Sequence, residues 1–215
     1  MKKIIMIFMA LFMLSGCAKY KMTVNVDEEG KVTSSLKSLI SEEALLSQNM
    51  TKDVALTTMK TSLVGNNDQA KVEEIKEEID HKTYYGLSIT HIKTSSIKSE
   101  VNGDEISVDI PVDHLLSSIK SGLPKNMTLK NIKKLGGEVS IVINMPSDAH
   151  SAVGKVDGKQ VKVDLLDLAY KNKDVKTIHV TSKKNNHVGM IAGIVLVIMI
   201  LAGILIVMKR KQKLD

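Results

Sequence analysis

The chain of 215 residues has no tryptophan, one cysteine and one arginine. A lone cysteine excludes an intramolecular disulfide, so Cys17 has no covalent partner within the chain. Both phenylalanines precede Cys17, and only four tyrosines follow it, so the core must be built from Ile, Leu, Val and Met. The basic residues are almost all lysines, which indicates an AT-rich genome. We therefore expect a low-GC Gram-positive bacterium as the source.

The charge is unevenly spread. The net charge is +6, but the basic excess lies at the two ends, in Lys2 and Lys3 and in the segment 209–213. Between the ends, lysines and acidic residues nearly balance, which gives no reason to expect a nucleic-acid partner. Basic residues beside apolar runs indicate a membrane instead.

The amino terminus has the parts of an export signal: two lysines, the apolar run Ile4–Leu14, and then small residues. Eleven apolar residues are too few to span roughly 30 Å of hydrocarbon. The next four positions, Leu14, Ser15, Gly16 and Cys17, resemble the lipobox of bacterial lipoprotein precursors. The resemblance implies that diacylglycerol is attached to the Cys17 sulfur and that residues 1–16 are removed. The alternative is an ordinary signal peptide with an incidental cysteine.

A second apolar run, Val188–Met208, carries no charge and is followed by basic residues. Its length predicts a transmembrane helix, and the export signal places residues 17–187 outside and the tail 209–215 in the cytoplasm. Gly189 and Gly193 form a GxxxG pattern that could pack against another helix. The alternative is that glycine is simply common in membrane helices.

Periodicity predicts one α+β domain between these anchors, with a mainly antiparallel sheet, an early hairpin and a helical region packed on it. The hairpin is expected over Lys19–Val26 and 31–39, and helices are expected after Ser41 and over 69–79. Further strands are expected at 83–93, 105–112, 138–146, 159–168 and 175–181, and a short helix at 113–123.

Several segments together resemble the LppM-type bacterial lipoproteins. They are the lipobox, the hairpin "YKMTVNVDEEGKVTSSL", the strand "YYGLSIT", the segment "NMPSDAHSAVGKVDGKQVKVDL" and the terminal apolar helix. Members of this family often have a tryptophan where this chain has Val163 and Asp164. The resemblance implies an extracytoplasmic α/β lipoprotein domain at the cell surface, a binding module with a lipid or glycolipid as its ligand.

The residues that could perform chemistry form no recognised motif. The six histidines include no HExxH and no pair at ligand spacing, and there is no GxSxG, so we expect no metal, no cofactor and no enzyme activity. The acidic stretch 73–80 with His81 could form a carboxylate site, but a solvated face is the favoured interpretation. Asp109, Asp113 and His114 are adjacent for the simpler reason that a strand ends and a helix begins there.

The sequence therefore predicts a membrane-anchored surface lipoprotein whose outer domain binds a lipid, a glycolipid or another envelope component. The first alternative is an accessory subunit of a membrane complex, recruited through the apolar helix or a sheet edge. The second is a hydrolytic envelope enzyme. Because both ends of the domain are tethered closely, we expect any ligand opening near Tyr20 and Lys183.

Overall fold

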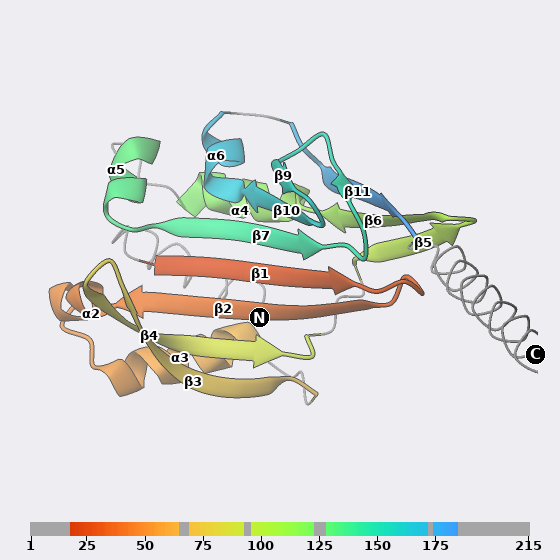
Figure 1. Ribbon diagram of the computed structural model, residues 1–215. Helices are drawn as coiled ribbons and strands as arrows, with labels where there is room; N and C mark the ends of the chain where they lie inside the picture. Colours follow the sequence, from red (N-terminus) through yellow and green to blue (C-terminus); the bar gives the residue numbers. More distant parts are fainter. Residues whose placement is uncertain (1–17, 65–68, 93–95, 123–127, 172–173, 185–215) are drawn as a thin grey trace, which may run out of the picture. The chain divides into compact units, whose positions relative to one another are not determined.

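Two β-sheets make up most of the computed structural model, which describes residues 18–64, 69–92, 96–122, 128–171 and 174–184 (Figure 1). The larger sheet has the order β3 (Lys71–Ile79), β4 (Lys82–Thr90), β2 (Val32–Ser41), β1 (Ala18–Val26), β7 (Glu138–Asn144), β10 (Gln160–Asp164) and β9 (Lys155–Asp157). The smaller sheet has the order β5 (Lys98–Asn102), β6 (Glu105–Pro111), β11 (Thr177–Lys183) and β8 (Ala149–His150).

Five helices within the described residues cover these sheets. They are α2 (Glu42–Ser47), α3 (Lys52–Val64), α4 (Asp113–Gly122), α5 (Leu129–Lys134) and α6 (Leu165–Tyr170). Helices α2 and α3 pack near β4, whereas α6 contacts α4, α5 and β7. The predicted helix start at Ser41 is confirmed, because its side chain accepts a hydrogen bond from the Ala44 backbone N–H.

The predicted hairpin after Cys17 is confirmed as β1 and β2, which pair from Ala18 with Ile40 to Val26 with Val32. The Asp27 side chain accepts hydrogen bonds from the backbone N–H groups of Glu29 and Lys31, which closes the turn. Gly30 has φ +77°, a conformation that glycine adopts without a steric cost. Local sequence therefore determines this hairpin.

The predicted fold class is wrong, because the protein is mostly strand and its larger sheet is mixed. Strand β7 lies parallel to β1, with Lys19 opposite Glu138 and Asn25 opposite Asn144. Five consecutive residues of β7, Val139 to Ile143, are buried, as expected of a strand covered on both faces. A long crossover through the smaller sheet and α4 allows this parallel pairing, which a short turn could not.

The helix expected over 69–79 is also wrong, because Lys71–Ile79 forms the edge strand β3. It pairs antiparallel with β4 from Lys71 opposite Thr90 to Ile79 opposite Lys82. In the strand expected over 159–168, the chain turns into helix α6 at Leu165, capped by the Asp164 side chain. The other expected strands correspond to β4, β6, β7 and β11, and the short helix to α4.

No helix among the described residues has the length and apolarity needed to cross a bilayer. The apolar run Val188–Met208, with Gly189 and Gly193, lies outside the described residues, as do the lipobox positions 14–17. The structure therefore supports neither the transmembrane helix nor the lipobox, and both remain predictions from the sequence.

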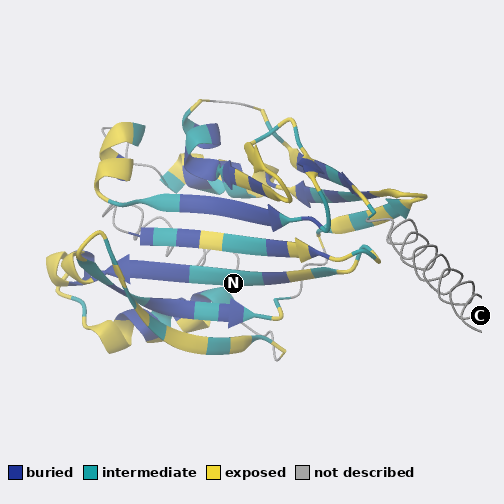
Figure 2. Ribbon diagram, in the orientation of Figure 1, coloured by how far each residue is buried: buried dark blue, intermediate teal, exposed yellow. Residues whose placement is uncertain are grey.

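Aliphatic side chains from both sheets and from the five described helices form one core. Figure 2 shows buried residues along the strands of both sheets. As the composition predicts, the core is dominated by Ile, Leu and Val, with Met59 fully buried and Tyr20 and Tyr84 as its aromatic members. Each fully buried aliphatic side chain contributes about 1.5–3 kcal/mol, so the protein needs no tryptophan to stabilise this fold.

The starts of β1 and β7 lie at one end of the larger sheet, and the end of β11 lies at the other. Lys19 is opposite Glu138 at the first end. At the far end, beyond Asn144, the Ser147 hydroxyl donates a hydrogen bond to the Lys183 carbonyl oxygen. Six residues of strand, about 20 Å, separate these places. Tyr20 and Lys183 therefore lie at opposite ends, so the prediction that one opening lies near both of them is wrong.

Candidate functional site

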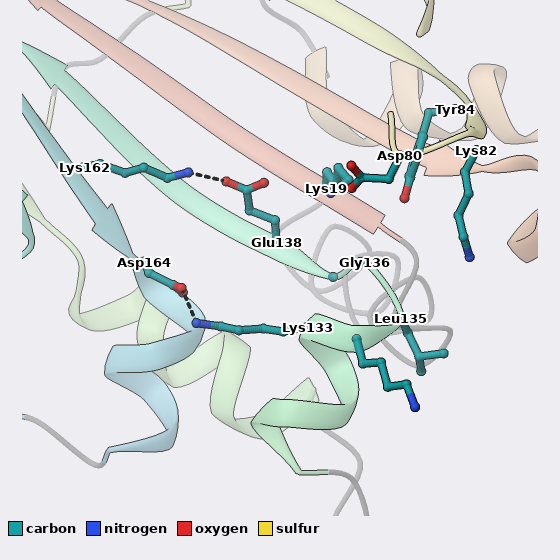
Figure 3. A pocket seen from close by; sticks show the side chains of 12 residues that line it. Lys19, Asp80, Lys82, Tyr84, Lys133, Leu135, Gly136, Glu138, Lys162 and Asp164 are labelled. Atoms are coloured by element: carbon teal, nitrogen blue, oxygen red, sulfur yellow. Dashed lines mark hydrogen bonds and ion pairs between the residues drawn. The ribbon is translucent and has the colours of Figure 1, made fainter. Parts of the chain in front are cut away.

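A pocket of about 350 Å³ opens at the end of the larger sheet where β1 begins (Figure 3). Its lining contains five lysines and three carboxylates, so the charged groups sum to +2. The lining residues are Lys19, Asp80, Lys82, Tyr84, Lys133, Lys134, Leu135, Gly136, Gly137, Glu138, Lys162 and Asp164. We call this site the lysine pocket.

The parallel pairing of β1 and β7 creates the pocket, because it brings segments distant in the sequence to one end of the sheet. Lys19 is the second residue of β1 and Glu138 the first residue of β7, and the two are register partners. The turn between β3 and β4 supplies Asp80, and β10 ends there at Asp164. Helix α5 ends beside β7 and brings two further lysines.

Gly136 allows α5 to end close to the sheet. Its φ is +93°, and a Cβ built there would lie 2.8 Å from the Tyr84 hydroxyl oxygen. The backbone N–H groups of Gly136 and Gly137 donate to the carbonyl oxygens of Lys133 and Ile132, which closes the end of the helix. A side chain at position 136 would therefore be strained and would press on the pocket wall.

Two ion pairs hold one side of the lysine pocket. The Lys133 Nζ lies 2.6 Å from Asp164 Oδ2, and the Lys162 Nζ lies 2.9 Å from Glu138 Oε1 (Figure 3). The Ser140 hydroxyl also donates to Glu138 Oε1 at 3.0 Å. These contacts keep two of the lysines engaged with the protein itself.

The carboxyl of Glu138 is ionised more readily than an isolated glutamate. Burial alone would raise its pKa, but Lys162, the Ser140 hydroxyl and Lys19 together outweigh this effect and hold the pKa below its ordinary value. The negative charge of Glu138 therefore persists into moderately acidic solution and keeps Lys162 in place.

Lys19 and Lys134, on the other side of the pocket, form none of the ion pairs found among the described residues, although Lys19 is close enough to Glu138 to lower its pKa. Lys19 Nζ lies 5.5 Å from the centre of the buried Tyr84 ring. Lys134 is exposed at the rim, next to Leu135, whose side chain is 40% exposed. Lysine ammonium groups around a pocket of this size can hold a phosphate or carboxylate group by charge-assisted hydrogen bonds.

Of the sequence-predicted candidates, Asp80 lines the lysine pocket, and the others lie elsewhere. The acidic stretch 73–80 lies on edge strand β3 and the turn that follows it, and Lys71 pairs with Glu73 at 2.8 Å, so it forms a charged strand rather than a helix face. His114 and Asp113 both lie in the first turn of α4. Asp109 instead contacts His179, with its Oδ1 2.7 Å from Nδ1. The lipidation site Cys17 is outside the described residues, one peptide bond before Ala18.

A serine also lies near the Asp109–His179 pair. The Ser151 hydroxyl donates to the backbone carbonyl oxygen of His179 at 2.9 Å rather than to its ring. A serine nucleophile needs its hydroxyl hydrogen-bonded to the imidazole base. The contacts made by Ser151 therefore differ from those of a catalytic triad.

In the comparisons with known proteins, the match found is to a solved structure. No family model matches the sequence, and no curated protein matches it. One solved structure has a similar arrangement. It is the NMR structure of the folded domain of LppM from Mycobacterium tuberculosis, with a TM-score of 0.41 and 9% identity over 79% of this chain and 91% of that chain. A structural neighbour of the expected type is thus found, but at this similarity it carries no conclusion about family or function.

The lysine pocket was not predicted from the sequence. The local signal was "KKLGGE", residues 133–138, in which two lysines end a helix, two glycines turn the chain and a glutamate starts a strand. Nothing in that segment indicates that Lys19 lies beside it, because their proximity depends on the parallel pairing of β1 with β7.

Proposed function

We propose that this chain is a lipid-anchored, extracytoplasmic, non-catalytic binding module whose lysine pocket holds the anionic group of an envelope molecule at the membrane surface. The observation that carries the proposal is the position of the pocket. Lys19, in the pocket lining, is two residues from Cys17, the cysteine of the lipobox-like sequence.

The tether explains why a charged pocket is suited to an envelope ligand. A lipid on Cys17 would hold the start of β1 at the bilayer surface, because two residues span at most about 7 Å. The lysine pocket would then lie at the depth of phospholipid head groups, whose phosphates are anionic. Each lysine near such a surface contributes about 1 kcal/mol to binding.

The chemistry of the pocket favours a head group over an acyl chain. Apart from Leu135 and the Tyr84 ring, the side chains that line it are charged. An acyl chain would leave these ammonium and carboxylate groups without water or partners, which is costly. A phosphate or carboxylate group would instead bind Lys19 and Lys134, which make no ion pair among the contacts found in the described residues.

The experiment uses the full chain in detergent and native mass spectrometry to compare retention of phosphatidylglycerol with that of phosphatidylcholine. The test variant is Lys19→Gln with Lys134→Gln. The control, Lys31→Gln with Lys159→Gln, removes the same charge at exposed positions at the far end of the sheet. At about 1 kcal/mol per lysine, the test variant should lose about thirtyfold in affinity for the anionic lipid.

The outcomes separate a pocket from a general electrostatic effect. Loss in the test variant alone supports the proposal. Equal loss in both variants means that net charge, and not the pocket, attracts the lipid. Recovery of a membrane protein in stoichiometric amount, with no preference for anionic lipid, would favour an accessory subunit instead.

A further inference from the structure

A second pocket, of about 580 Å³, lies on the exposed face of the smaller sheet. It is lined by Ala149, His150, Ser151, Ala152, Val153 and Val156 and by three residues of β11, Thr177, His179 and Thr181. We call it the histidine pocket. Its two imidazoles come from positions 29 residues apart in the sequence, and only the pairing of β8 with β11 relates them.

The strand register places both imidazoles on one face of the sheet. Along β11, Ile178 and Val180 are buried, and Thr177 and His179 are exposed on the opposite face, which Thr181 shares by alternation. His150 is the register partner of Thr181 and is itself exposed. Directly paired residues share a face, so His150 and His179 are diagonal neighbours, with Cα atoms about 7–8 Å apart.

Asp109 fixes the orientation of one ring. It is the register partner of His179 on β6, and its Oδ1 lies 2.7 Å from His179 Nδ1. A carboxylate accepts a hydrogen bond only from N–H, so in the neutral ring the hydrogen is on Nδ1 and Nε2 carries the free lone pair. Histidines that bind metal commonly donate their second nitrogen to a carboxylate in this way.

We propose that His150 and His179 bind a divalent transition-metal ion, with Asp109 as the residue that positions His179. Imidazole nitrogens bind Zn²⁺ at about 2.0–2.1 Å, a distance that two diagonal side chains on one sheet face can both reach. Imidazole also suits Cu²⁺, which similar ligand sets bind more tightly than Zn²⁺.

The site has an open coordination sphere. The proposed set of protein ligands stops at the two imidazoles, because the described residues hold no group of three or more His, Cys, Asp or Glu that could bind a metal ion. Water, or a donor group of a second molecule, completes the sphere. Thr177 and Thr181 line the same pocket, and their hydroxyls can hydrogen-bond such ligands.

The test measures metal binding directly, on the full chain in detergent and without a histidine tag. Zn²⁺ affinity is obtained by competition with a chromophoric indicator, and the electron paramagnetic resonance spectrum of added Cu²⁺ reports how many imidazole nitrogens bind it. Wild type should show one site with two nitrogens. His150→Ala or His179→Ala should each weaken binding at least tenfold and leave one nitrogen.

Matched controls separate this site from other histidines. His114→Ala removes an exposed imidazole from α4 and should leave the affinity unchanged. Asp109→Asn should weaken Zn²⁺ binding about 10- to 100-fold while the copper spectrum retains two nitrogens. Asp113→Asn should leave both the Zn²⁺ affinity and the copper spectrum unchanged. His150→Gln and His179→Gln repeat the comparison if an alanine variant does not fold.

Two results would overturn the proposal. One is equal affinity in wild type and in the variant lacking both His150 and His179. The other is a wild-type copper spectrum with a single nitrogen, which would mean that the rings do not converge on one ion. Neither result would contradict the proposed function of the lysine pocket, which lies at the end of the other sheet.

Discussion

Replacing Gly86 by alanine tests the pairing of β2 with β4, on which the larger sheet depends. Gly86 lies in β4 between Leu39 of β2 and Ile75 of β3. A Cβ added there would be 1.9 Å from the Ser38 carbonyl oxygen and 2.9 Å from the Leu39 Cα. Both are backbone atoms, so relief requires the two strands to separate by more than an ångström.

The expected cost follows from that displacement. Overpacking a close contact costs about 1–3 kcal/mol, and each ladder hydrogen bond weakened nearby costs about 0.5–1.5 kcal/mol. We therefore expect Gly86→Ala to lower the free energy of unfolding by about 3 kcal/mol. With a denaturant slope of about 2 kcal/mol per molar urea, the midpoint should fall by about 1.5 M.

The assay is urea unfolding of the fragment 18–184, followed by circular dichroism. The matched control is Gly103→Ala, where a Cβ meets nothing within 4 Å and only the φ of +64° opposes the substitution. The left-handed conformation costs about 1–2 kcal/mol, so the control midpoint should fall by about half as much. If Gly86→Ala shifts the midpoint no further than Gly103→Ala, the strands are not paired in this register.

Two other predictions follow from single side chains. Cys17→Ala should abolish labelling by a fatty-acid probe and leave residues 1–16 attached, and normal labelling would show that the lipobox interpretation is wrong. Burial raises the pKa of Tyr20 to about 12, above its unfolded value near 10, so wild type should lose about 1.4 kcal/mol of stability per pH unit between about 10 and 12. Tyr20→Phe should remove this contribution, and identical pH profiles of the unfolding free energy would contradict it.

Local patterns predicted the elements whose stability is local. The β1–β2 hairpin and the start of α2 at Ser41 both depend on residues close in sequence, and both are present. Along β1, the buried residues Ala18, Tyr20, Val24 and Val26 share one face, as expected of a strand with alternating hydrophobicity.

The prediction failed where partners distant in the sequence decide the structure. Val72, Ile75 and Ile79 have helical spacing, yet pairing with β4 makes the segment a strand, because tertiary contacts outweigh a weak intrinsic preference. The parallel contact of β1 with β7 joins residues about 119 positions apart, and no local pattern encodes it. Both pockets depend on such contacts, which is why neither the lysines nor the histidines were predicted as sites.

Residues 18 and 184, the first and last that the structure describes, lie at opposite ends of the larger sheet, and this placement determines how the domain would bear mechanical force. Strand β1 begins with Ala18 at one end of the larger sheet, and residue 184 follows β11 at the far end. Tension between these ends pulls β1 along its own axis, so it loads the ladders to β2 and β7 in shear. All the hydrogen bonds of the nine β2 pairs and seven β7 pairs then resist together, instead of opening one by one as in a peeled hairpin.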